Sequence, residues 1–169
     1  MFSVNQTVSY SVTGVCKIVN IEHRMVQGED REFYVLQPVF DPNSTVMVPT
    51  ENQMLTQKMH PVMSKSEVES LINEIPDEQP VWVENDRERY EAYKSIIQSG
   101  DRRGVVGLIK ALYLHRKEQI KKGRKLRSGD ERIMREAERV LYSEFALALY
   151  MKPDEILPFL KDKLGAVGA

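Results

Sequence analysis

Polar and apolar residues alternate with a period of two along much of the first fifty residues. Val8, Tyr10 and Val12 alternate with small polar residues, and Thr13-Gly14 then has the composition of a turn. Later alternating runs are separated by turn-forming residues, among them Gly28 and Pro42. The expected strands cover residues 7–12, 15–21, 31–38 and 45–48. Several short strands joined by tight turns predict a small antiparallel β-barrel, a fold that often binds partners through an edge strand.

Near residue 60 the apolar period changes from two to 3.6, which predicts helices. Helix starts are indicated where Ser or Asn precedes Glu by three positions, the capping-box pattern: Ser64 with Glu67, Asn85 with Glu88, and Ser128 with Glu131. Pro153 suits the first turn of a last helix, in which Pro158 predicts a kink or a late start. The expected helices cover residues 64–75, 86–99, 102–122, 128–149 and 153–164. Residues 61–169 are therefore expected to form a bundle of about five helices, which gives an α+β chain.

The segment 82–103 holds the single tryptophan, Trp82, just before an expected helix start at Asp86. Ser99-Gly100-Asp101 ends that helix, and the Asp101 carboxylate is placed to cap the next one. Two interpretations of Trp82 remain open. Most aromatic side chains complete a core, but an indole at the edge of a helix also suits contact with a partner.

Composition limits the class of protein. The single cysteine, Cys16, excludes an internal disulfide framework and fits a reducing cytoplasm. No apolar run approaches the roughly 20 residues that cross a membrane, and residues 1–10 lack a secretion-signal pattern. A soluble cytoplasmic protein is expected, with no membrane partner.

Charge is concentrated in one part of the chain. The net charge is −1, yet residues 102–139 carry 13 Lys/Arg against 5 Asp/Glu. The most basic stretch is the expected loop 121–127, with further cations on the adjoining helix ends. Such a loop can contact several phosphates at once, although a solvated helical face can also be this basic. Because no zinc finger or recognition helix is evident, any DNA binding should be weak, salt-dependent and poor in sequence information.

Signs of catalysis are absent from the sequence. The three histidines show no metal-ligand spacing, and Cys16 lies in an apolar strand where a thiol is unreactive. No phosphate-binding loop, dinucleotide fingerprint, zinc-protease motif or nucleophile elbow occurs. We expect no enzyme, no cofactor and no small-molecule substrate.

Short sequence pieces occur in order along almost the whole chain. They are V-x-Y-x-x-x-G-V from Val8 to Val15, Phe33-Tyr34-Val35-Leu36 after Gly28, Val46-Met47-Val48-Pro49-Thr50-Glu51-Asn52, Arg87-x-Arg89-Tyr90 with Ser99-Gly100-Asp101, and LYSEFALAL from Leu141 to Leu149. Together they resemble the CarD family of bacterial transcription regulators, also called CdnL. The V-P-x-E-N, S-G-D and E-x-A-L-A pieces are the more specific ones.

The resemblance implies two domains with separate partners. Residues 1–60 would form a Tudor/SH3-like barrel that docks on the β subunit of RNA polymerase. Residues 61–169 would contact promoter DNA just upstream of the bubble, where a tryptophan wedges at the minor groove and stabilises the open complex. The polymerase contacts would come from Arg24, Val26 and Met47. The DNA contacts would come from Trp82, Arg87, Arg89, Lys125, Arg127 and Arg132.

The sequence departs from the family pattern at two positions. Counted back from Arg89-Tyr90, the family's tryptophan position falls on Asp86, so Trp82 lies four residues early, about one helical turn. Met47 stands where some members carry arginine. The barrel also resembles the polymerase-interacting module of transcription-repair coupling factor, but no helicase motif accompanies it. Two other classes stay open, a protein-interaction adaptor without specific DNA binding and a small-molecule enzyme with an unrecognised pocket.

Overall fold

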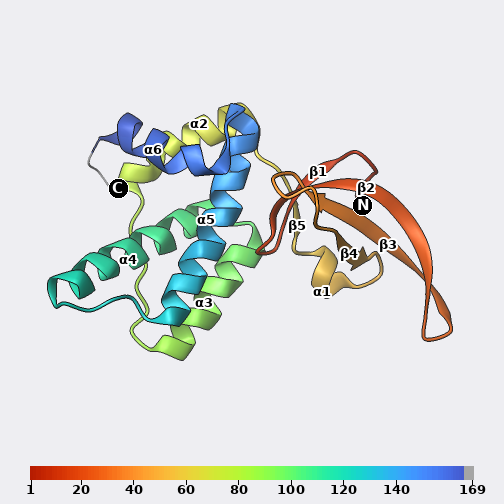
Figure 1. The fold of residues 1–169 in the computed structure, drawn as a ribbon, viewed down its shortest axis with the longest axis horizontal. Coiled ribbons are helices and arrows are strands. Elements are labelled where there is room, and N and C mark those ends of the chain that lie inside the picture. The colour runs from red at the N-terminus through yellow and green to blue at the C-terminus, as the bar shows by residue number, and fades with distance from the viewer. Residues whose placement is uncertain (166–169) are drawn as a thin grey trace.

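A five-stranded antiparallel sheet is followed by helices, which confirms the expected α+β class (Figure 1). The computed structural model describes residues 1–165, and the last four residues of the expected segment 61–169 lie outside the described residues. The strands are β1 (Thr7–Tyr10), β2 (Gly14–Val26), β3 (Glu29–Pro38), β4 (Val46–Pro49) and β5 (Met59–Pro61). They are ordered β4-β3-β2-β1-β5 in the sheet. Strand β5, which the apolar pattern did not place, pairs with β1 and leads directly into the helices.

Strand β2 is longer than its apolar pattern predicts. It runs for 13 residues, and its second half pairs with β3 as a hairpin that extends away from the helices (Figure 1). The register shifts between Ile18 and Asn20, so Ile18 is buried while Val19 is 40% exposed. Beyond this bulge the outer half of β2 is mostly exposed on both faces. A strand that is solvated on both faces has no apolar alternation. The outer half of β2 could therefore not be predicted from the sequence pattern.

The core of the sheet is formed by alternate residues of β1, β2 and β3 with single contributions from β4 and β5. Its fully buried side chains include Val8, Ile18, Leu36 and Val48. Cys16 belongs to this core with no exposed surface, and burial raises the pKa of its thiol to about 12. The thiol therefore stays protonated and unreactive at neutral pH, in agreement with its apolar sequence context.

The helices are α1 (Gln53–Thr56), α2 (Lys65–Glu74), the 3₁₀ helix η1 (Ile75–Asp77), α3 (Asp86–Ser99), α4 (Arg102–Lys121), α5 (Ser128–Leu149) and α6 (Pro153–Leu164). Helix α5 runs through the middle of the bundle, with α3 and α4 beside it and α2 and α6 near its end (Figure 1). Phe145, Leu108 and Ile156 are completely buried in this second core. The bundle of about five helices is therefore present among the described residues.

Helix starts agree with the sequence in two of the three capping boxes. Ser64 and Glu67 exchange both capping hydrogen bonds, and the Asn85 side chain accepts a bond from the Glu88 N–H at 3.0 Å. The third box is wrong, because Ser128 is already the first residue of α5. The late start suggested by Pro158 is also wrong, since α6 begins at Pro153 and continues through Pro158. An interior proline removes one helical hydrogen bond, yet α6 keeps its apolar side, with Ile156 and Leu160, buried in the bundle.

The sheet and the helical bundle pack directly against each other. The Val15 N–H at the start of β2 donates to the Ser143 hydroxyl of α5 at 3.2 Å. Arg102 of α4 donates to the Pro61 carbonyl at 2.6 Å and forms an ion pair of 2.8 Å with Glu144, which is 2% exposed. These polar contacts, of which the Val15–Ser143 hydrogen bond is buried, hold the end of the sheet against the helices.

Gly14 lies at this junction with φ +92°, and a Cβ added there would come within 2.6 Å of the Ser143 hydroxyl. We expect Gly14→Ala to lower the free energy of unfolding by about 1–3 kcal/mol from backbone strain alone, with a further loss from the clash. Gly28 in the hairpin turn has φ +81°, and within residues 1–165 no atom lies closer than 4 Å to an added Cβ. Gly28→Ala is therefore the matched control for strain, and urea unfolding should place it closer to the parent. Equal losses for both variants would show that the junction tolerates the added methyl group.

Candidate functional site

The segment 78–85, called here the Trp82 segment, joins η1 to α3 and has no regular secondary structure. The Tyr93 hydroxyl donates to the Val81 carbonyl, and the Val81 N–H donates to the Gly107 carbonyl at 3.4 Å. A Cβ at Gly107 would lie 3.0 Å from the Gln79 carbonyl oxygen. Gly107 of α4 therefore leaves room for the backbone of the Trp82 segment to lie close against the helix.

Trp82 is half-buried and contacts both the helical core and solvent. Its ring stacks on His115 of α4, with centroids 4.2 Å apart and an interplanar angle of 27°. The Arg89 guanidinium carbon lies 4.4 Å from the indole centroid, and the indole N–H donates to Glu84 at 2.9 Å. The ring therefore packs on the core, as the first interpretation predicts, and it also lines a surface hollow. Contact with a partner stays a prediction.

Arg89 is enclosed within the protein, with 1% of its surface exposed. Its guanidinium forms a two-bond pair with Asp130, which has no exposed surface, at 2.9 Å for each bond. It also donates to Asp86 at 2.8 Å and to the Val83 carbonyl at 3.0 Å. Burial lowers the pKa of Arg89, but the two carboxylates outweigh burial and raise it. The expectation that Arg89 contacts DNA directly does not fit this geometry, because its donors are already used inside the protein.

The hollow beside Trp82 has a volume of about 780 Å³ and is called here the basic hollow. Its lining comes from the Trp82 segment, the start of α3, the end of α4 and the loop after α4. The residues are Trp82, Glu84, Asn85, Asp86, Arg87, Arg89, His115, Gln119, Arg124, Lys125 and Arg127. The loop after α4 returns toward the starts of α3 and α5, which brings these distant segments together (Figure 1).

The cations of the basic hollow differ in whether a carboxylate of the protein already pairs with them. The Arg127 side chain is 71% exposed and donates to Asp86, and Arg87 pairs with Glu91 at 3.4 Å on an open surface. Hydrogen bonding from Arg89 lowers the pKa of Asp86, burial opposes this, and Arg127 lowers it further, so Asp86 stays ionised. Arg124 and Lys125 are exposed and have no carboxylate within 4.0 Å among residues 1–165. These two side chains are the ones best placed to bind an anion.

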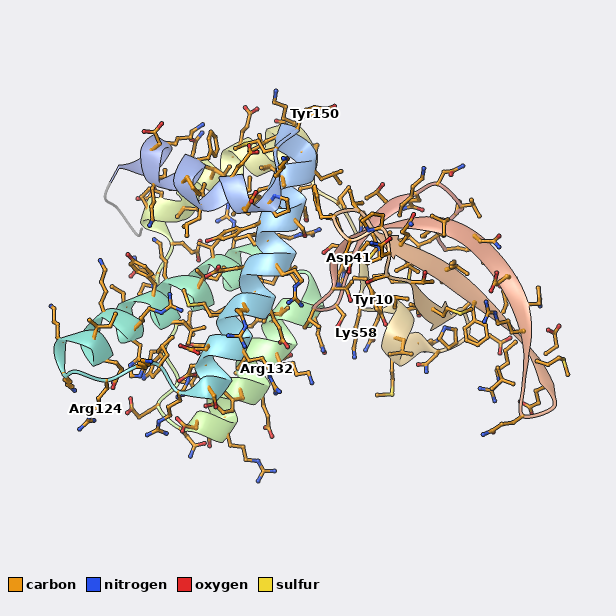
Figure 2. All side chains as sticks on the ribbon, in the orientation of Figure 1. Tyr10, Asp41, Lys58, Arg124, Arg132 and Tyr150 are labelled. Carbon is orange, nitrogen blue, oxygen red and sulfur yellow. The ribbon has the colours of Figure 1, made fainter. Side chains whose placement is uncertain are left out.

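The remaining sequence-predicted cation lies outside the basic hollow. Arg132 is exposed on α5, one turn beyond the loop, whereas Arg124 lies in the loop itself (Figure 2). Asp86, the position to which the resemblance assigns the family's tryptophan, lines the same hollow as Trp82. His115 and Asp130 were missed by sequence reasoning, since nothing local marks a partner that lies so far along the chain.

Arg24, Val26 and Met47 share the outer face of the sheet. Residues paired across neighbouring strands point to the same face, and Met47 pairs with Val35, which in turn pairs with Asn20. Arg24 and Val26 follow Asn20 on the same side of β2, because alternate residues of a strand share a face. The surface formed by Arg24, Val26, Phe33, Val35 and Met47 is called here the barrel face.

The barrel face combines apolar area with a charged end. Phe33 and Val35 are half-buried on β3, which lies between the edge strand β4 with Met47 and strand β2 with Arg24. Arg24 is exposed and held by Glu22 at 2.6 Å. The alternation of Phe33 and Val35 with buried Tyr34 and Leu36 was the sequence signal for these two additional residues.

The described residues hold neither a metal-binding cluster nor a membrane-spanning helix. Residues 1–165 contain no cluster of three or more His, Cys, Asp or Glu side chains that is arranged to bind a metal. Within the same residues, no helix combines the length and the apolarity that crossing a bilayer requires.

Comparison with protein-family models matches the two structural parts separately. Residues 2–63 match the model described as the CarD-like/TRCF RID domain, and residues 68–161 match the model described as the CarD C-terminal domain. The first match covers the Tudor-like sheet and the second covers α3, α4 and α5 with most of α2 and α6. The chain therefore belongs to the CarD family of transcription-related proteins.

Proposed function

We propose that the protein regulates transcription by bridging RNA polymerase and promoter DNA. The barrel face would bind the polymerase β subunit, and the basic hollow would contact DNA just upstream of the bubble and stabilise the open complex. One observation supports the proposal: the indole of Trp82 and the exposed cations Arg124 and Lys125 line the same hollow. A wedge and its phosphate contacts have to act on one stretch of duplex, so they must share a face.

The DNA contact would combine ion pairs to phosphates with an apolar contact to the bases. Arg124, Lys125 and Arg127 would neutralise neighbouring phosphates, which holds the protein on the duplex without reading its sequence. The indole edge would then rest against partly unstacked bases, and an apolar group in that position disfavours reclosure of the bubble. Arg132 extends the positive surface along α5.

The polymerase contact is supported by the barrel face and by the family of the N-terminal domain. An apolar centre with an arginine at its margin is a common composition for a protein interface. Strand β4 is the last strand on its side of the sheet, and an edge strand can receive a strand from a partner. The proposal assigns no catalytic step and no cofactor, and it places the protein in the cytoplasm, on the nucleoid with the polymerase.

Removal of the two exposed cations of the loop tests the DNA contact. The double variant Arg124→Ala/Lys125→Ala should weaken promoter binding and reduce the slope of log affinity against log salt by about 0.9 per lost phosphate contact. Filter binding of polymerase–promoter complexes across a salt series measures this slope. Lys161→Ala/Lys163→Ala removes two exposed charges from α6, away from the hollow. This double variant should leave the salt slope unchanged. Identical slopes for both double variants would refute a DNA role for the loop.

The function itself is tested by transcription from a defined promoter with purified polymerase. The protein should bind polymerase in a pull-down and lengthen the lifetime of open complexes challenged with heparin. Binding to polymerase without any change in lifetime would favour the alternative function, an interaction adaptor that uses the barrel face alone.

A further inference from the structure

We infer that Arg89, held by Asp130, is a positioning residue that fixes the Trp82 indole at the rim of the basic hollow before DNA is bound. The inference rests on the proposed function in one respect, the role of the indole at DNA. The positioning itself is a property of the free protein.

Arg89 connects three parts of the structure through one rigid group. One edge of its guanidinium is fixed by the carboxylate of Asp130, 41 residues further along the chain. Another nitrogen donates to the carbonyls of Val83 and Glu84, at 3.0 and 3.3 Å, immediately after the tryptophan. The guanidinium carbon lies 4.4 Å from the indole centroid. The backbone and the ring of the Trp82 segment are thus both held by this one side chain.

A purely structural role does not require this chemistry. Apolar side chains of similar volume usually stabilise a core as well as a buried ion pair does, because removing two charges from water is costly. A planar guanidinium supplies what apolar groups lack, since it can hold a carboxylate and backbone carbonyls in fixed directions while its face lies against an aromatic ring. These properties match the task of orienting a segment that has no helix or strand of its own.

The same network reaches the basic loop. Asp86 accepts a hydrogen bond from Arg89 through one oxygen and one from Arg127 through the other. The chain of charges Asp130, Arg89, Asp86 and Arg127 therefore links the indole segment to a cation of the hollow. A site held in its binding geometry loses less conformational entropy on association, so binding energy is not spent on ordering the segment.

Fluorescence of the free protein tests the inference directly, because Trp82 is the single tryptophan. Arg89→Lys keeps the charge but cannot reproduce the fork that reaches Asp130 and the carbonyls together. We expect acrylamide quenching of Trp82 to rise about twofold or more and its emission to shift to the red, while the helical circular dichroism stays that of the parent. Arg87→Lys makes the same substitution two residues away on an 89% exposed side chain and should change neither signal.

Asp130→Asn is the second variant that tests the inference if Arg89→Lys fails to fold. It preserves the shape of the side chain and one acceptor while removing the charge that holds Arg89, so quenching should again increase. Parent-like quenching and emission in a folded Arg89 or Asp130 variant would overturn the inference, whatever happens to transcription. Increased quenching with an unchanged open-complex lifetime would uphold the positioning and refute the proposed role of the indole at DNA. Increased quenching together with a shortened lifetime would support both.

Discussion

Asp130→Ala is expected to lower the free energy of unfolding by about 3 kcal/mol. Asp130 has no exposed surface and accepts two hydrogen bonds from Arg89, whose own surface is 1% exposed. Its removal leaves a buried guanidinium without its principal partner, a change that typically costs about 3–5 kcal/mol. The lower end applies because Asp86 remains bonded to Arg89.

Glu91→Ala supplies the contrast for this prediction. It also breaks an arginine–carboxylate pair of α3, but the side chains of Arg87 and Glu91 are 89% and 69% exposed. Exposed pairs of this kind contribute about 0.5 kcal/mol or less. Urea unfolding followed by circular dichroism measures both variants on one scale. Comparable losses for the two would mean that the Asp130 pair contributes no more than a surface contact.

Trp82→Ala is expected to shorten the open-complex lifetime about tenfold while polymerase binding stays intact. Contacts between an aromatic side chain and nucleic-acid bases are worth about 1–3 kcal/mol, which corresponds to factors around ten. The indole lines the basic hollow, whereas the barrel face lies on the sheet, so the two activities should separate.

Leu157→Ala is the control for this second prediction. Leu157 is a partly exposed apolar residue of α6 and does not line the basic hollow. Heparin-challenge kinetics should show parent behaviour for Leu157→Ala and the shortened lifetime for Trp82→Ala alone. If both variants match the parent, the indole is a packing residue and the wedge lies elsewhere.

Local sequence chemistry predicted most of the helices because their ends are set by neighbouring residues. Ser64, Asn85 and Asp101 each cap a helix with a side chain that accepts a hydrogen bond three residues ahead. Such contacts are visible in the sequence itself. Ser128 failed as a cap although the spacing was right, since α5 begins at Ser128 and leaves Arg127 in the capping position.

The candidate site was less predictable because it is assembled from distant segments. The sequence indicated Trp82 and the basic loop separately, and the structure places both at one hollow. The family resemblance implied that Arg89 contacts DNA, which would require an exposed side chain. Its burial depends on Asp130, and the stacking of Trp82 depends on His115. No local rule relates these partners, so the roles of Arg89 and His115 could be found only from the fold.

In the sheet, too, features set by neighbouring residues were predicted and features set by distant partners were not. Alternation identified the buried faces of β1 and β3, where one side meets the core. It did not identify the outer half of β2 or the short strand β5, because their burial is incomplete and their pairing partners lie elsewhere in the chain. The barrel face became visible only through the register that aligns Met47 with Val35.

The central claim, that one surface docks on polymerase and another acts on DNA, is tested most directly by one titration. Open-complex lifetime is measured against protein concentration for the parent, Met47→Glu and Trp82→Ala. We predict that Met47→Glu raises the concentration for half-maximal effect about tenfold without changing the plateau. Trp82→Ala should lower the plateau at an unchanged half-maximal concentration. Variants that shift both quantities together would contradict the separation of the two surfaces.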